Sequence, residues 1–113
     1  MKLLFLVLNK IECLEGILTK LASEGLTGAT ILDSQGLAQN LYNSKGLSFM
    51  ASLRMFMGPD NNENKTVFMV LEDEKVAAVS KIVNEVTGGL DGHNTGILFT
   101  VDVDYIEGFK KHE

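Results

Sequence analysis

The order strand, helix, strand occurs twice in this chain, and that repetition constrains the fold more than any other feature. Short, nearly continuous apolar runs indicate strands, and apolar residues that recur every three or four positions indicate helices. The expected elements are, in chain order, a strand at Lys2–Leu8, a helix from Ile11 to Ala22, a strand at Thr27–Asp33, a strand at Lys65–Leu71, a helix from Val76 to Val86 and a strand at Thr95–Val103. Such a chain closes most simply as an α+β sandwich, with four antiparallel strands and both helices on one face.

This βαββαβ order is typical of ferredoxin-like domains, and 113 residues fit a single domain spanning 1–113. Residues 36–64 form a long loop between the second and third strands, and residues 104–113 form a short C-terminal tail. A loop of that length in so small a domain is usually functional. Its middle is rich in phenylalanine and methionine, so it either packs on the domain or docks on a protein partner. The residues expected to do so are Phe49, Met50, Leu53, Arg54, Met55 and Phe56.

Three of the expected strands are apolar at nearly every position, at Leu3–Leu8, Val67–Leu71 and Ile97–Val101. A strand of that kind is covered on both faces. Two helices can cover only one face of the sheet, and the chain has no residues left for a second cover. We therefore expect another copy of the chain to cover the open face, as in a homo-oligomer.

Charge and composition exclude several classes of function. Fifteen acidic residues against ten basic ones give a net charge of −5, and Arg54 is the sole arginine. Nucleic-acid binding needs a basic surface, so we expect none. The single cysteine, Cys13, excludes an internal disulfide and a cysteine-based zinc site. The first apolar run is short and is interpreted as a strand, so we expect a cytoplasmic protein without membrane insertion.

Several segments together match one protein family over nearly the whole chain. They are Gly25-Leu26-Thr27-Gly28-Ala29-Thr30, the long loop opened by Gly36, the glycine-rich turn Gly88–Gly92, and Gly96-Ile97-Leu98-Phe99. In these segments the chain resembles the P-II signalling proteins, the nitrogen regulatory family. The resemblance implies a homotrimer that binds a small effector in clefts between subunits. It also implies that the long loop, called the T-loop, signals to a protein target such as a transporter or an enzyme.

The resemblance places the effector against the second strand, the base of the loop and the glycine-rich turn. The implied ligand-binding residues are Thr30, Gly36, Leu37, Ala38, Gln39, Asn40, Lys65, Gly88, Gly89, Leu90, Asp91, Gly92 and His93. Gln39 and Asn40 stand where the family has a phosphate-contacting arginine and a glutamine that orients magnesium and 2-oxoglutarate. Glu107 and Phe109 stand where it has two arginines. The charge of ATP would be poorly neutralised, so the expected adenine nucleotide is ADP or AMP rather than ATP.

No catalytic or metal-binding constellation is visible in the sequence, so we do not expect an enzyme. The chain has no Walker loop and no nucleophile elbow, and His93 with Asp91 lacks the spacing of metal ligands. Two alternatives share the strand order. An amino-acid- or metabolite-binding regulatory module would place its ligand at the turn after the first strand, near Asn9. An acylphosphatase-like enzyme would need an arginine in that turn, and Asn9-Lys10-Ile11 has none.

Overall fold

Four antiparallel strands form one sheet in the order β2-β3-β1-β4 in the computed structural model, which describes residues 1–37 and 63–110. The strands are β1 (Lys2–Leu8), β2 (Thr30–Ser34), β3 (Asn64–Leu71) and β4 (Gly96–Asp102). The helices are α1 (Leu14–Ser23) and α4 (Val76–Thr87), entered through the 3₁₀ turns η1 (Ile11–Cys13) and η2 (Asp73–Lys75). This architecture confirms the predicted ferredoxin-like α+β fold.

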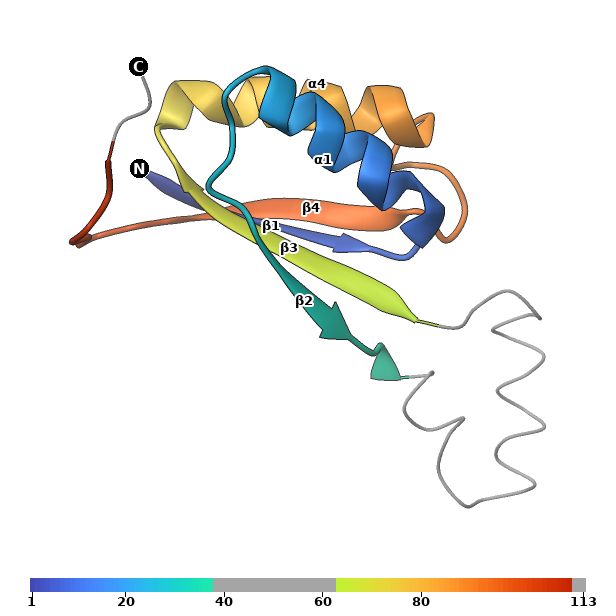
Figure 1. Ribbon diagram of the computed structural model, residues 1–113. Coiled ribbons are helices and arrows are strands. Elements are labelled where there is room, and N and C mark those ends of the chain that lie inside the picture. The colour runs from blue at the N-terminus through green and yellow to red at the C-terminus, as the bar shows by residue number, and fades with distance from the viewer. Residues whose placement is uncertain (38–62, 111–113) are drawn as a thin grey trace.

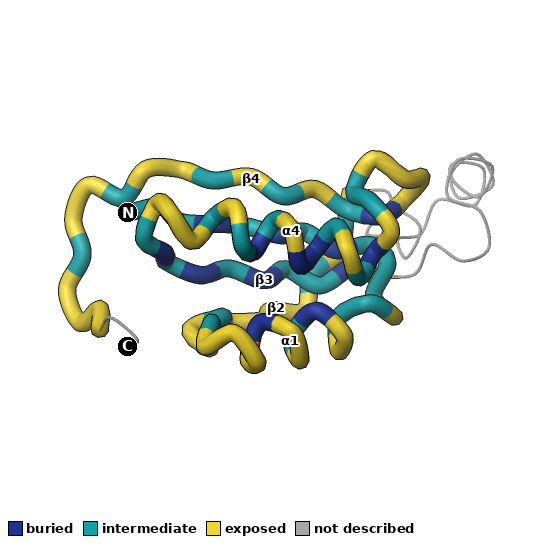
Figure 2. Tube along the Cα trace, turned by 90° about the horizontal axis from the view of Figure 1, so that it is seen from above, coloured by how far each residue is buried: buried dark blue, intermediate teal, exposed yellow. Residues whose placement is uncertain are grey.

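Both helices lie on the same face of the sheet (Figure 1). The core lies between the helices and the sheet. Apolar residues at alternate positions of β1 and β3 point to the helices, where they meet the apolar stripes of α1 and α4. The buried hydrophobic residues of this core are Leu4, Leu6, Leu8, Ile17, Leu21, Val67, Met69, Leu71, Val79, Ile82 and Val83. Figure 2 shows buried and exposed positions alternating along each helix.

The second strand is shorter than predicted, because it begins at Thr30 rather than Thr27. The chain leaves α1 through Gly25, whose φ of +77° suits a residue without a side chain, and the Leu26 N–H donates to Leu21 O at 2.8 Å. Residues 27–29 therefore belong to no strand, and pairing with β3 starts only at Thr30. The last strand likewise begins at Gly96, since Thr95 O accepts hydrogen bonds from the N–H groups after β1.

The other face of the sheet is apolar, and no helix from residues 1–37 or 63–110 lies on it (Figure 1). Aligned positions of β3, β1 and β4 place Phe68, Phe5 and Phe99 in one row across the sheet. The rings of Phe5 and Phe99 are stacked with centroids 5.1 Å apart, and those of Phe5 and Phe68 are tilted at 6.1 Å. On β4, Ile97 and Val101 remain 57% and 46% exposed. Within the described residues, the predicted apolar second face is therefore present but uncovered.

None of the helices in residues 1–37 and 63–110 is long and apolar enough to cross a lipid bilayer. Cys13 lies at the end of η1, partly buried, with its Sγ 3.7 Å from Val86 O of α4. The neighbouring Lys10 donates from Nζ to Thr87 O at 3.1 Å, at the C-terminus of that helix. Cys13 and Lys10 therefore connect the first helical turn to α4.

Candidate functional site

The glycine-rich turn predicted to contact a ligand joins α4 to β4, and part of its backbone is already hydrogen-bonded. The Gly89 N–H donates to Thr87 Oγ1 at 3.2 Å, and the Leu90 N–H donates to Asn84 Oδ1 at 2.9 Å. These bonds hold the turn against the end of α4. Two of the amides that could have bound an anion therefore have acceptors within the subunit.

The tip of the same turn faces solvent. Asp91, Gly92 and His93 are all exposed, and the Gly92 N–H donates to Gly89 O at 3.2 Å, which closes the turn. In residues 1–37 and 63–110, no three His, Cys, Asp or Glu side chains gather in a way that could hold a metal ion. The turn thus presents one carboxylate and one imidazole to a ligand that approaches from outside the subunit.

The base of the long loop is fixed by a small polar cluster. The Ser34 hydroxyl donates to Asn64 Oδ1 and lies 2.8 Å from Thr66 Oγ1, and Asn64 is buried. Gly36 lies two residues after Ser34, and a Cβ built there would lie 3.7 Å from Asn64 Nδ2. The next residue, Leu37, is 77% exposed. The two ends of the connection between β2 and β3 are therefore held side by side.

Lys65, predicted to bind the ligand, is paired within the sheet. Its Nζ lies 2.6 Å from Asp33 Oδ1, the carboxylate directly across the β2–β3 ladder. The hydrogen bond from Lys65 to Asp33 raises the pKa of the lysine above its usual 10.5. A ligand phosphate would have to compete with Asp33 for this ammonium group.

We expect Asp33→Asn to lower the pKa of Lys65 and to weaken the pH dependence of stability in the alkaline range. A raised pKa means that the folded state holds the proton more tightly than the unfolded chain. The stabilisation is therefore fully present below pH 10.5 and is lost as the pH rises through the folded-state pKa. NMR titration of the Lys65 side chain measures the shift. An unchanged Lys65 pKa in the variant would contradict the assignment of Asp33 as its cause.

The loop base and the glycine-rich turn lie at the same end of the sheet but at opposite edges. Gly36 follows β2, the turn Gly88–His93 precedes β4, and these are the two outer strands. Three strand spacings separate the outer strands, which is about 14 Å. One subunit therefore does not bring the two predicted halves of the effector site into contact.

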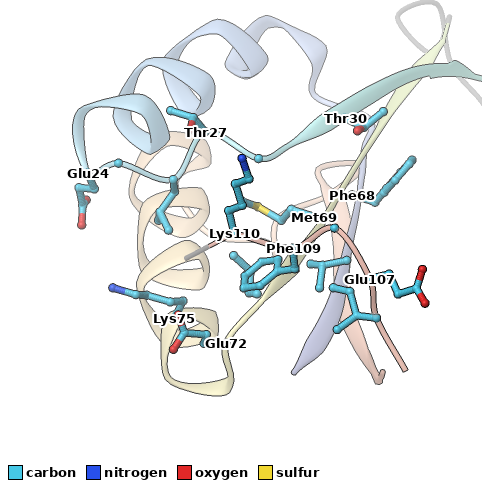
Figure 3. Close-up of a pocket in the computed structure, with 17 residues that line it drawn as sticks. Glu24, Thr27, Thr30, Phe68, Met69, Glu72, Lys75, Glu107, Phe109 and Lys110 are labelled. Atoms are coloured by element: carbon cyan, nitrogen blue, oxygen red, sulfur yellow. The ribbon is translucent and has the colours of Figure 1, made fainter. Parts of the chain in front are cut away.

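Thr30 lies apart from both, at the start of β2, where it lines a cavity of about 670 Å³ near the other end of the sheet (Figure 3). Three segments form its walls: the linker Glu24–Gly28 with Thr30, the end of β3 with Glu72 just before η2 and Lys75 at the end of η2 (Phe68–Glu72 and Lys75), and the tail Ile106–Lys110. The volume is that of a small-molecule site. Of the predicted ligand-binding residues, this cavity contains Thr30 alone.

The sequence did not indicate this cavity, because its walls are distant in the chain and carry no motif. In the tail, the resemblance to the P-II proteins concerns Glu107 and Phe109, which stand where those proteins have two arginines. Phe109 inside a charged segment was the one available signal, since an apolar ring in a polar tail tends to contact the domain.

Several predicted residues fall in 38–62, outside the described residues. The ligand-binding predictions among them are Ala38, Gln39 and Asn40, and the partner-binding predictions are Phe49, Met50, Leu53, Arg54, Met55 and Phe56.

In the comparisons with known proteins, no family model and no curated protein matches this chain.

Proposed function

We propose that the chain is a P-II-like regulator: a homotrimer that binds a small effector between subunits and signals through the loop 36–64 to a protein target. The observation that carries this proposal is the separation of the loop base from the glycine-rich turn. Both lie at one end of the sheet but on opposite edges. A site that uses both needs two subunits, with the β2 edge of one beside the β4 edge of the next.

The uncovered face of the sheet supports the assembly. Phe5, Phe68 and Phe99 form an aromatic row flanked by aliphatic residues, and Ile97, Phe99 and Val101 on β4 are each at least 42% exposed. Large contiguous apolar patches on small proteins are usually interfaces. A second copy of the chain is the simplest cover, because each copy has the same surface to bury.

The electrostatics of the two predicted half-sites favour an effector of low charge. The Lys65 ammonium is paired with Asp33, and the turn adds the carboxylate of Asp91. Two turn amides already have acceptors. ADP or AMP would require less neutralisation than ATP, so we propose one of these as the adenine nucleotide effector.

A ligand at the turn after β1, as in the alternative regulatory module or an acylphosphatase-like enzyme, receives less support. There the N–H groups of Asn9 and Lys10 both donate to Thr95 O, at 2.9 and 3.1 Å. Anion or carboxylate binding at this turn would need those amides to face the ligand. The chain is therefore proposed to act as a non-enzymatic regulator with its effector at the other two segments.

Thermal unfolding with ATP, ADP and AMP, together with the mass in solution, tests this function. A nucleotide that binds the folded trimer raises the midpoint, and we expect a larger rise with ADP or AMP than with ATP. Gly36→Trp should abolish the rise by filling the loop base; among the described residues a Cβ at Gly36 meets Asn64 Nδ2 at an ordinary 3.7 Å, and the midpoint of the free variant serves as the control for folding. A protein that is trimeric but shows no shift with any nucleotide would contradict the effector assignment.

A further inference from the structure

The sheet has an incomplete edge inside the cavity. β2 pairs with β3 only from Asn64 to Phe68, whereas β1 pairs with β3 from Lys65 to Leu71. On the β2 side, Met69–Leu71 therefore has no strand beside it among the described residues. Alternate residues of a strand point their N–H and C=O groups to opposite neighbours. At least one of these three residues thus presents both groups to the cavity.

The linker after α1 forms another wall, with Thr27 and Gly28 among its lining residues. Residues 27–29 run between Gly25 and the start of β2 without regular secondary structure, and the tail Ile106–Lys110 forms the remaining side. An unpaired strand edge of three residues is about 10 Å long, the length of an extended tripeptide. Backbone groups in such a slot recognise the alternating donors and acceptors of a peptide main chain.

The side chains around the slot are apolar residues and both kinds of charged residue, which fit the two oppositely charged ends of a free peptide. The charged residues are Lys75, Lys110, Glu24, Glu72 and Glu107. Leu26, Met69 and Phe109 provide apolar surface on different walls. In Figure 3, Lys110 reaches from the tail toward Thr27. No ion pair of Lys110 is found within residues 1–37 and 63–110, so its ammonium can pair with a peptide carboxylate.

We propose that this cavity is a second binding site, which takes a short extended peptide with apolar side chains and a free C-terminal carboxylate. The peptide adds a strand to β3 at Met69–Leu71, its side chains alternate between the core side and the tail side, and its carboxylate pairs with Lys110. Gly36 and the glycine-rich turn lie at the other end of the sheet from this cavity. Thr30, which was also predicted to contact the effector, lines the cavity.

Calorimetry and amide NMR with trileucine, as the free acid and as the C-terminal amide, test the proposal on the full chain. We expect millimolar or tighter binding of the acid, with the largest amide shifts at Met69–Leu71 and residues 27–29, and about tenfold weaker binding of the amide. Lys110→Ala should remove the difference between acid and amide. Gly28→Trp should abolish binding by filling the slot, since a Cβ at Gly28 meets no atom within 4 Å.

Gly36→Trp is the matched control, because it adds the same ring at the far end of the sheet. It should leave trileucine binding unchanged while removing the nucleotide response, so failure of either site is seen separately. The proposal is overturned if the free acid does not bind, or if binding survives Gly28→Trp in a folded protein. It is also overturned if the edge of β3 proves to be paired with another copy of the chain.

Discussion

We expect Gly96→Ala to lower the free energy of unfolding by about 2–3 kcal/mol, because β4 approaches β1 closely at this residue. A Cβ built at Gly96 lies 2.6 Å from Val7 O and 3.3 Å from Leu8 Cα, both backbone atoms. Backbone cannot turn aside as the end of a side chain can. The substitution therefore forces apart the first pair of the β1–β4 ladder, Leu8 and Gly96.

Chemical denaturation of the two proteins measures this loss, and Gly28→Ala is its control. Gly28 has open space at the Cβ position, and the change should be neutral or stabilise by about 0.4–1 kcal/mol through the unfolded chain. A Gly96→Ala protein within about 0.5 kcal/mol of the parent would show that the strands separate at this point at little cost.

Phe99→Glu should dissociate the proposed homotrimer. Phe99 is 42% exposed on β4, the outer strand of the uncovered face, with its ring stacked on Phe5. In an interface its carboxylate replacement would be buried beside other apolar residues without a partner, which costs several kcal/mol at each copy. In a free subunit the same side chain reaches water at the edge of the stack. The expected result is a folded monomer, seen by light scattering and circular dichroism.

Ala77→Glu provides the matched control, because it adds the same charge at an exposed position of α4. This helix lies on the opposite side of the sheet from the apolar face that carries Phe99 (Figure 1). It should leave the mass in solution unchanged. If Phe99→Glu also leaves the mass unchanged, the apolar face is not the interface. The trimer, and with it the effector site between subunits, would then need another arrangement.

The two inner strands, β1 and β3, each of which has a strand on either side, were the most predictable from sequence. β1 was predicted with its observed bounds, and β3 differs by one residue, because continuous apolar runs determine which segments cross the centre of a sheet. β2 was predicted three residues too early. Its start depends on where the chain leaves α1 at Gly25, a tertiary constraint that apolar patterning does not record.

The candidate site was less predictable than the fold. The resemblance to the P-II proteins placed Gly36 and the turn Gly88–His93 in one ligand site. Within a subunit the two segments are apart, because the strand order puts β2 and β4 at opposite edges of the sheet. Strand order depends on how the two strand–helix–strand halves pair, which the sequence pattern does not give. The ion pair of Lys65 with Asp33 follows from the β2–β3 register. The register of a strand can be predicted from its sequence only when one face is buried and the other is not. Because β2 is exposed at four of its five positions, its register with β3 could not be predicted.

The strand order also determines how the protein must fold. Every ladder in the sheet joins one strand–helix–strand half to the other: β1 to β3, β1 to β4 and β2 to β3. Lys2 pairs with Asp102, a hundred residues away, and the nearest ladder contact, Ser34 with Asn64, still spans thirty. Among the residues that the structure describes, neither half contains a strand pair of its own, so we infer that neither nucleates the sheet by itself. Each of these strand pairs forms only after the ends of the 36–64 connection, or of a longer segment, have come together, so we expect slow folding, as in proteins of high contact order. We also expect the two halves to fold in a single cooperative step.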